Sequence, residues 1–242
     1  MSGLQSQGNE AGGELTVGLP FWKRALDLVV ITLLSPIWLT VGILVAIIVK
    51  LGSPGPIFFR QQRVGFRKRE FTIYKFRTMQ VNADNGQHKA HTRQLMTSQV
   101  PMTKLDTRKN SGLIPLGGVL RAVGIDELPQ ILNVIRGEMS LVGPRPCIPY
   151  EFELYEPWQQ RRTDAVPGLT GLWQVSGKNR TTFIQMINFD LDYARNKSLA
   201  MDLGIILKTP PALWRQYLDT KALKRKESAS RSAGIPKSVE SY

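Results

Sequence analysis

The chain has 242 residues and carries 32 Lys and Arg against 19 Asp and Glu, which gives a net charge of +13. Hydrophobic residues make up 42 % of it and mean hydropathy is −0.15, values that exclude a multi-span membrane protein and a wholly disordered chain. The single cysteine, Cys147, excludes an internal disulfide framework and an all-cysteine metal site. A pI near 10.1 indicates an anionic partner: nucleic acid, phosphorylated small molecules or an acidic membrane surface.

The two ends of the chain differ in composition from the rest. Residues 1–20 are rich in glycine and lack a basic region before the first apolar run, so we expect a disordered leader and no cleaved secretory signal. Residues 219–242 are basic and serine-rich without an apolar period, which predicts a solvated, disordered tail.

An apolar segment runs from Ala25 to Val49, long enough as a helix to cross a hydrocarbon core of about 30 Å. Ser35 and Pro36 interrupt it near the middle, where proline removes a backbone donor and bends the helix. Basic residues flank both ends, although positive charge favours one side of a membrane, the cytoplasmic side. An ordinary transmembrane helix is one interpretation. A helix that breaks at Ser35-Pro36 and returns to the same face explains both features, so we expect a re-entrant, monotopic helix over residues 21–50.

Two polar side chains of this segment need partners. The Ser35 hydroxyl is expected to bond a carbonyl that Pro36 leaves free. Asp27 is expected to pair with Lys23 or Arg24, because an ion pair lowers the cost of a carboxylate close to lipid.

The next segment combines basic and aromatic residues. Alternation over Phe71–Phe76 predicts a short strand. Seven Lys or Arg and one acid lie from Arg60 to Arg77, interleaved with phenylalanines. This pattern suits single-stranded nucleic acid or anionic lipid headgroups, and a solvated face is the plain alternative. The neighbouring membrane segment favours the lipid surface.

Three later stretches have simpler patterns. Residues 181–196 and 199–214 have the apolar spacing of amphipathic helices, which more often pack on a core than on a membrane, and Pro210-Pro211 is expected to break the second. Trp214 favours a place at the membrane interface for that helix. The glycines of residues 168–177 suit either a close approach to a ligand or a turn, and the stretch lacks the spacing of an ATP-binding P-loop.

The stretch from 120 to 146 carries the densest set of candidate functional residues. Asp126 is well placed as a helix N-cap, and a core-facing helical spacing follows at Leu128, Ile131, Leu132 and Ile135. The plain interpretation of Asp126-Glu127 is therefore a cap and an acid that complements the helix dipole. Two arginines favour a functional role over this plain interpretation: Arg121 lies nearby, and Arg145 is held between two prolines. Two adjacent carboxylates with rigidly held arginines suggest a divalent metal and a phosphate.

Four motifs occur in the order in which they stand in the bacterial sugar transferases, the monotopic phosphoglycosyl transferases that start surface-glycan assembly. They are YKFRTM at 74–79, DELPQ at 126–130, MSLVGPRP at 139–146 and PGLTGLWQVSG at 167–177. The resemblance covers about Phe21 to Trp214. It includes the apolar segment broken at Ser35-Pro36, which is similar to that family's re-entrant membrane helix.

The resemblance implies transfer of a hexose-1-phosphate from a UDP-sugar, UDP-glucose or UDP-galactose, to polyprenol (undecaprenyl) phosphate, with release of UMP. By position, Asp126 matches the family's nucleophile and Glu127 its Mg²⁺-linked partner, so Mg²⁺ on these two carboxylates is the implied cofactor. Arg121 and Arg145 match phosphate-contacting arginines, and Lys75 matches a lysine needed for activity. The implied location is the cytoplasmic face of the bacterial inner membrane.

We therefore expect an α+β, mostly helical protein, with a re-entrant membrane helix, interfacial amphipathic helices, a small β element and a cytosolic catalytic domain over residues 51–218. Anionic substrates and anionic membrane lipids would account for the positive charge without nucleic acid. The alternative is a membrane-attached basic scaffold without catalysis, which leaves Asp126, Glu127 and Arg145 unexplained. Within the enzyme interpretation, direct transfer in a ternary complex is the alternative to a covalent phosphosugar on Asp126.

Overall fold

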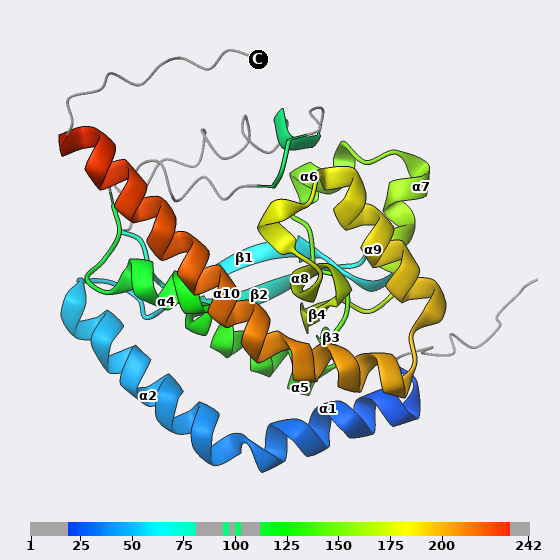
Figure 1. Ribbon diagram of the computed structural model, residues 1–242. Helices are drawn as coiled ribbons and strands as arrows, with labels where there is room; N and C mark the ends of the chain where they lie inside the picture. Colours follow the sequence, from blue (N-terminus) through cyan, green and yellow to red (C-terminus); the bar gives the residue numbers. More distant parts are fainter. Residues whose placement is uncertain (1–18, 81–93, 97–99, 103–111, 233–242) are drawn as a thin grey trace, which may run out of the picture.

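The computed structural model describes residues 19–80, 94–96, 100–102 and 112–232 (Figure 1). Helices dominate these residues, and the strands form two small two-stranded sheets. The expected mostly helical α+β class is therefore confirmed. The leader expected over residues 1–20 lies outside the described residues except for its last two.

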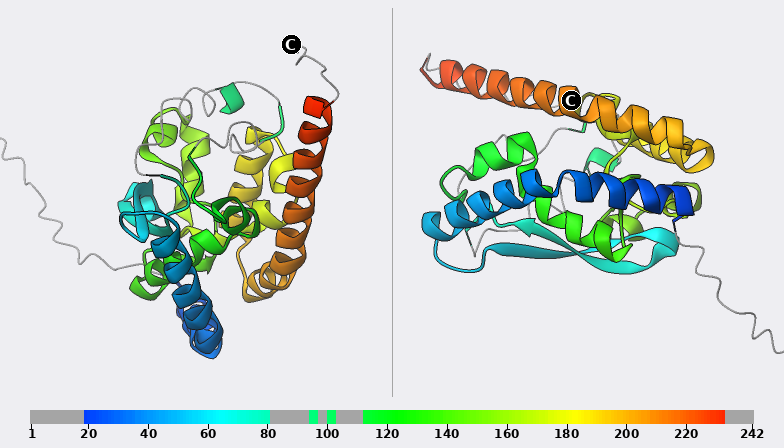
Figure 2. Two further views of the ribbon diagram at one scale, coloured as in Figure 1. Left: turned by 90° about the vertical axis from the view of Figure 1, so that its left-hand side faces the viewer. Right: turned by 90° about the horizontal axis from the view of Figure 1, so that it is seen from below.

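The N-terminal part consists of two helices and a hairpin: α1 (Phe21–Leu33), α2 (Ser35–Gly52), β1 (Phe58–Val64), the 3-10 turn η1 (Phe66–Lys68) and β2 (Glu70–Phe76). The strands pair antiparallel, with Phe59 opposite Lys75 and Arg63 opposite Phe71. The strand predicted over 71–76 is confirmed. Seen from below, α1 and α2 lie between the hairpin on one side and the last helix, α10 (Leu199–Ser232), on the other (Figure 2).

Helices α1 and α2 meet in an elbow that projects from the rest of the molecule at the bottom of Figure 1. Pro36 has no N–H to offer the Thr32 carbonyl four residues earlier. The Ser35 hydroxyl donates to that carbonyl at 2.8 Å instead. The predicted break at Ser35-Pro36 and the predicted role of the Ser35 hydroxyl are both confirmed.

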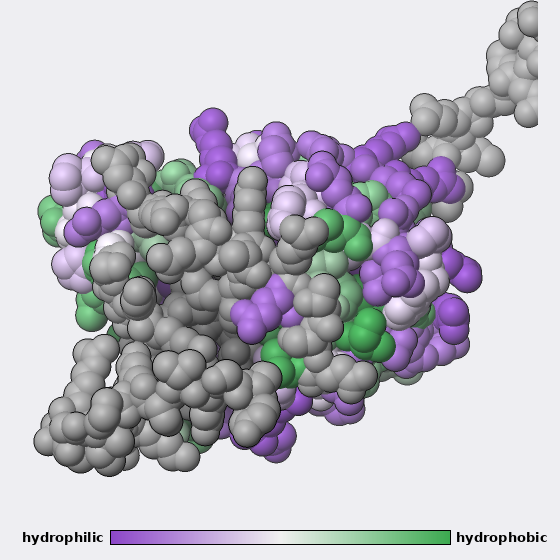
Figure 3. Space-filling model, turned by 90° about the horizontal axis from the view of Figure 1, so that it is seen from above, coloured by the Kyte–Doolittle hydropathy of each residue, from purple (hydrophilic) through white to green (hydrophobic). Residues whose placement is uncertain are grey.

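The outer surfaces of α1 and α2 are apolar. Within the described part of the chain, α2 is the one helix long and apolar enough to cross a membrane, and little of it is buried. Large apolar side chains are exposed along both helices: Leu33, Ile37, Ile43, Leu44, Ile47 and Leu51. The opposite face of the molecule is largely hydrophilic where described residues form it (Figure 3). This asymmetry is typical of a protein with one face in contact with lipid or another apolar partner.

The inner face of α1 is polar and buried. Lys23 forms an ion pair with Asp202 at 2.5 Å and donates to the Tyr193 hydroxyl at 2.8 Å. Asp27 accepts hydrogen bonds from the Ser140 hydroxyl at 3.0 Å and from the next backbone amide at 2.9 Å. These polar contacts fix α1 to several elements of the C-terminal part.

The pairing predicted for Asp27 is wrong. Lys23 has Asp202 as its ion-pair partner, and Arg24 donates to the carbonyls of Val134 and Ile135. Asp27 Oδ1 accepts two hydrogen bonds instead, and Asp27 Oδ2 is buried without a hydrogen-bond partner among the described residues, because α1 packs against the interior of the domain along the face that carries Asp27.

The C-terminal part consists of short elements followed by two long helices. In chain order these are α4 (Gly117–Val123), η3 (Ile125–Gln130), α5 (Ile131–Arg136), β3 (Ser140–Val142), α6 (Pro149–Glu153), α7 (Pro157–Gln160), η4 (Arg161–Asp164), β4 (Gly168–Thr170), α8 (Leu172–Val175), η5 (Lys178–Arg180), α9 (Phe183–Asn196) and α10 (Leu199–Ser232). The helix predicted over 181–196 is confirmed as α9, with Thr182 as its N-cap.

Strands β3 and β4 pair parallel, with Ser140 opposite Gly168. The backbones approach so closely here that a Cβ on Gly168 would lie 2.0 Å from the Gly143 nitrogen, and one on Gly171 would lie 2.2 Å from the Gly143 oxygen. Gly168 and Gly171 therefore serve close backbone packing. Gly177 has a φ of +120°, which a turn accommodates most easily with glycine.

Helix α10 corrects two expectations. It continues through Pro210 and Pro211 without a break, because it packs against α4, α8 and both strands of the second sheet, and Thr209 bonds both Thr170 and its own helix. It also extends to Ser232 (Figure 1). The tail expected to be disordered from residue 219 is therefore helical up to 232, in a stretch rich in the strong helix formers Lys, Arg and Ala.

The buried Lys23–Asp202 pair yields a test of how firmly α1 belongs to the fold. Lys23→Met leaves the Asp202 charge buried and unpaired, and we expect the free energy of unfolding to fall by about 3–5 kcal/mol. Adding Asp202→Leu removes that charge and should recover much of the loss. Denaturant unfolding in detergent micelles measures both. Arg180→Met is the control, since its pair with Asp219 is exposed and should contribute at most about 1 kcal/mol; an equal loss in Lys23→Met and Arg180→Met contradicts the prediction.

Candidate active site

Asp126 and Glu127 lie in η3, a 3-10 turn that leads directly into α5. Gly124, with a φ of +77°, precedes this turn, so Asp126 is not the helix N-cap that the sequence predicts. The amide of Glu127 donates to the Gly124 carbonyl at 3.1 Å. Charged side chains rather than this amide are therefore left to contact a ligand.

The core face predicted for this segment is correct only in its first half. Leu128 and Ile131 join apolar clusters, whereas Leu132 and Ile135 are 42 % and 41 % exposed. The 3-10 turn advances about 120° per residue instead of 100°, so the buried face rotates before α5 begins. The buried positions are Asn133 and Val134 instead.

Glu127 is held between two cations from distant segments. Lys75 Nζ, from β2, lies 2.8 Å from Glu127 Oε1. Arg145, from the loop after β3, places Nη2 2.8 Å from the same oxygen and Nη1 3.3 Å from Oε2. The side chains of Lys75, Glu127 and Arg145 remain 14 %, 22 % and 28 % exposed, so the cluster is open to solvent.

The charges of this cluster fix its protonation. Burial alone would raise the pKa of Glu127, but Arg145 and Lys75 hold that pKa well below its usual range. Burial lowers the pKa of Lys75 to about 8, with the Glu127 charge opposing the shift. The Glu127 charge raises the pKa of Arg145. At neutral pH the cluster is therefore an ionised carboxylate between two cations.

Asp126 belongs to the same electrostatic environment. Its negative charge opposes the lowering of the Lys75 pKa and adds to the raising of the Arg145 pKa. In a 3-10 turn neighbouring side chains point about 120° apart, so Asp126 and Glu127 do not share a direction. Arg121 is half-buried in the last turn of α4, just before Gly124. Ser35 and Pro36 form the elbow and take no part in this cluster.

Two cations near Glu127 were not among the predicted site residues. Lys178, in η5, is close enough for its charge to lower the pKa of Glu127, and it donates to Gln216 at 2.7 Å. Arg63, on β1, has its pKa lowered to about 10 by burial and by the charge of Arg145. Both residues stood in stretches that predicted other roles, a glycine-rich turn and a membrane flank. Only the fold brings them to Glu127.

Positive charge therefore exceeds negative charge at this site. Among the described residues, four cations (Lys75, Arg145, Arg63 and Lys178) contribute to the electrostatics of this cluster, against three carboxylates (Asp126, Glu127 and Glu151). Such an excess of fixed donors, with exposed faces, suits a ligand that carries several negative charges, as a diphosphate does.

Comparison with known proteins agrees with this geometry. A family model described as "Bacterial sugar transferase" matches residues 19–216. The chain belongs to this family. Its members are enzymes, and because relatives in Caulobacter vibrioides and Xanthomonas campestris are named as glucose-1-phosphate transferases, the protein is a phosphoglycosyl transferase.

Individual relatives of this sugar transferase have names that specify reactions or pathways. The exopolysaccharide production protein ExoY of Sinorhizobium fredii is 39 % identical over 79 % of this chain and 84 % of its own length. The UDP-glucose:undecaprenyl-phosphate glucose-1-phosphate transferase of Caulobacter vibrioides is 40 % identical over 84 % and 73 %. The UDP-galactose-lipid carrier transferase of Erwinia amylovora is 39 % identical over 78 % of this chain and 39 % of its own length.

Proposed function

We propose that the protein transfers a hexose-1-phosphate from a UDP-sugar to undecaprenyl phosphate and releases UMP, as the first step of exopolysaccharide or other surface-glycan synthesis. The observation that carries the proposal is the ionised Glu127 held between Lys75 and Arg145, directly after Asp126. The names of the relatives support the substrates, since two of them specify a UDP-hexose and one specifies undecaprenyl phosphate. A scaffold without catalysis gives no reason for this arrangement.

In the first step, an oxygen of Asp126 attacks the β-phosphorus of the UDP-sugar. The bond from that phosphorus to the bridging oxygen breaks, UMP leaves with the electron pair, and Asp126 carries the phosphosugar as an acyl phosphate. A covalent carboxylate step of this kind divides one difficult displacement into two. Lys75 and Arg145 neutralise charge on the phosphoryl oxygens, and their contacts with Glu127 hold them in place before the substrate arrives.

In the second step, a phosphate oxygen of undecaprenyl phosphate attacks the phosphorus on Asp126. The acyl phosphate bond breaks, the Asp126 carboxylate is regenerated, and the lipid diphosphate sugar leaves. No proton has to be abstracted in either step, because both nucleophiles are already anions. Glu127 remains ionised throughout and orients the cations.

The proposal includes a Mg²⁺ ion, which a carboxylate of this pair, Glu127 or Asp126, would hold. Carboxylate oxygens are its preferred protein ligands, and Mg²⁺ in phosphoryl-transfer sites commonly takes one or two carboxylates with the rest of its shell from water and phosphate. Across the described ranges of the chain no cluster of three His, Cys, Asp or Glu forms, so the ion would be shared with the diphosphate. When bound, Mg²⁺ neutralises developing charge on the leaving UMP.

The proposal places the enzyme at the cytoplasmic face of the bacterial inner membrane. The elbow and the exposed apolar side chains of α1 and α2 suit a helix that enters and leaves on one face. Exposed Arg60 and Arg136, which flank the Tyr74 ring, suit anionic lipid headgroups beside it. The catalytic domain would then lie on the membrane surface over residues 51–218, where undecaprenyl phosphate presents its headgroup.

Release of UMP from UDP-sugars tests the reaction. We expect purified protein with undecaprenyl phosphate and Mg²⁺ to release UMP from UDP-glucose or UDP-galactose. A chelator should suppress the release, because it removes the Mg²⁺ that would neutralise negative charge on the diphosphate. Nucleotide chromatography measures UMP, and comparison of the two donors identifies the hexose. Release of UDP instead of UMP, or of no nucleotide under any condition, contradicts the proposed function.

A labelling experiment without acceptor tests the covalent step. With a UDP-sugar labelled in the β-phosphate, we expect a burst of about one UMP per active site and a base-labile label on the protein, because only the first step proceeds. Asp126→Asn should abolish both. Asp164→Asn is the control, since Asp164 is an exposed carboxylate in η4. UMP release that requires the acceptor would favour the ternary alternative.

Cysteine labelling tests the re-entrant topology. Single cysteines at Gly18 and Arg60 should both react with a membrane-impermeant thiol reagent from the cytoplasmic side only. The native Cys147 should stay unlabelled in folded protein, because it is 4 % exposed and burial raises its thiol pKa. Reaction of the two positions from opposite sides of the membrane would show an ordinary transmembrane helix instead.

A further inference from the structure

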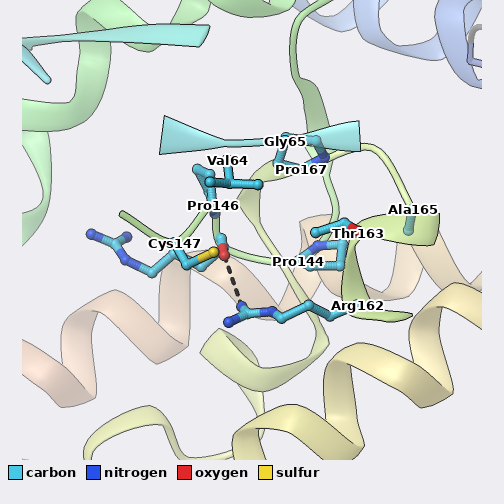
Figure 4. A pocket seen from close by; sticks show the side chains of 10 residues that line it. Val64, Gly65, Pro144, Pro146, Cys147, Arg162, Thr163, Ala165 and Pro167 are labelled. Atoms are coloured by element: carbon cyan, nitrogen blue, oxygen red, sulfur yellow. Dashed lines mark hydrogen bonds between the residues drawn. The ribbon is translucent and has the colours of Figure 1, made fainter. Parts of the chain in front are cut away.

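The loop that carries Arg145, residues 143–146, is held by two other arginines through its backbone. Arg162, in η4, donates from Nη2 to the Arg145 carbonyl at 2.8 Å, the dashed line in Figure 4. Arg63, on β1, donates from Nη1 to the Pro146 carbonyl at 2.9 Å. Two consecutive carbonyls are thus bound by guanidinium groups from separate elements.

Arg162 is itself fixed from outside the loop. It is 3 % exposed and forms an ion pair with Asp190 of α9 at 2.5 Å. Its Nη1 donates to the Tyr155 hydroxyl at 2.8 Å. A buried ion pair contributes little net stability on average, since desolvation offsets the attraction. The three partners (Asp190, the Tyr155 hydroxyl and the Arg145 carbonyl) do, however, fix the orientation of the Arg162 guanidinium.

On its other side the loop packs closely against residues 166–168, next to the small pocket of Figure 4. A Cβ on Gly143 would lie 2.2 Å from the Val166 oxygen, and the Gly168 amide donates to the Pro144 carbonyl at 2.9 Å. Pro144 and Pro146 restrict the backbone further. The loop is therefore fixed on both sides, while the Arg145 side chain remains 28 % exposed.

We propose that Arg162, together with Asp190, is a positioning residue that sets where Arg145 meets the substrate phosphate. The inference rests on the proposed function, in which Arg145 contacts the UDP-sugar diphosphate. A guanidinium recognises phosphate through parallel N–H donors, whose geometry is demanding, and a misplacement of about 1 Å can cost a factor of about 100 in rate. Arg145 has to keep its contact with Glu127 and reach the phosphate at the same time, so its backbone has to be fixed.

The test uses the full-length protein and the triple variant Arg162→Met/Asp190→Leu/Tyr155→Phe. It removes the bond to the Arg145 carbonyl without leaving a buried charge or hydroxyl unpaired, and apolar replacement of a buried ion pair is often neutral for stability. Arg77→Met is the matched control. Arg77 is 5 % exposed and, like Arg162, donates to the backbone of a loop, here to the carbonyls of Ser53 and Pro54, but this loop carries no proposed ligand residue.

Each variant is measured for its thermal unfolding midpoint and for kcat and KM with UDP-glucose or UDP-galactose, whichever the wild-type protein uses. We expect the triple variant to lower kcat/KM about 10- to 100-fold. When Arg145→Ala is already present, the same three substitutions should lower kcat/KM by less than about a third of that factor, because both changes act through Arg145. Arg77→Met should lower the unfolding midpoint without this dependence on Arg145.

Two results would overturn the proposal. One is a folded triple variant with unchanged kcat/KM, and the other is an effect of equal size with and without Arg145→Ala. If the triple variant does not fold, Asp190→Asn, which keeps the side-chain volume, replaces it. Its effect on kcat/KM is then compared with and without Arg145→Ala in the same double-mutant cycle, and the same two results would overturn the proposal. A wild-type protein that releases no UMP contradicts the proposed function itself, whereas an active wild type with an additive cycle contradicts only the positioning role.

Discussion

The ionised Glu127 side chain joins three segments that lie far apart in the sequence. Lys75 reaches it from β2 and Arg145 from the loop after β3, while Glu127 itself lies in η3. Without its charge, two half-buried cations would face each other unscreened, and like charges in a partly desolvated site repel strongly. The positions of the hairpin, of η3 and of the loop therefore depend on one another, and the site exists only when all three are in place.

The same η3 turn packs on α2. Leu128 packs in clusters with side chains of α2, and a Cβ on Gly42 would lie 3.7 Å from a Leu128 methyl group. Ile125, on the other side of Asp126 and Glu127, joins the same cluster as Val45 and Val49. The position of α2 is therefore transmitted to the two carboxylates through packed side chains. In the proposed membrane arrangement, the height at which the headgroup of the acceptor meets Asp126 would be set by α1 and α2.

Local signals in the sequence were sufficient for some of these features and not for others. The elbow at Ser35-Pro36 follows from proline stereochemistry, and the hydroxyl that satisfies the freed carbonyl is its immediate neighbour. The buried face after Asp126 could not be predicted by helical spacing, because a 3-10 turn shifts the angle before α5 begins. The break predicted at Pro210 and Pro211 was wrong because tertiary packing keeps α10 continuous where local helix propensity opposes it.

For the site, motif order located Asp126, Glu127, Lys75 and Arg145, and the structure brings them together. It could not provide Arg63, Arg162 or Lys178, whose contacts join residues 17 to 83 positions apart. Nor could it show that Lys23 pairs with Asp202, 179 residues away. Local patterns in one sequence do not indicate which residues far apart in the chain come into contact. An isolated basic residue is therefore expected to be solvated, as most basic residues are.

The buried polar face of α1 has a practical consequence for obtaining a water-soluble form of this enzyme. Deleting residues 21–52 would remove partners of Asp202 and Tyr193 and open the two apolar clusters that contain η3 residues, so the remaining fragment would expose new apolar surface. The helices have to stay. Solubility is better increased by replacing exposed apolar side chains on their outer surface with polar ones. Leu33, Ile37 and Leu44 are suitable positions, since they are 73 %, 63 % and 56 % exposed.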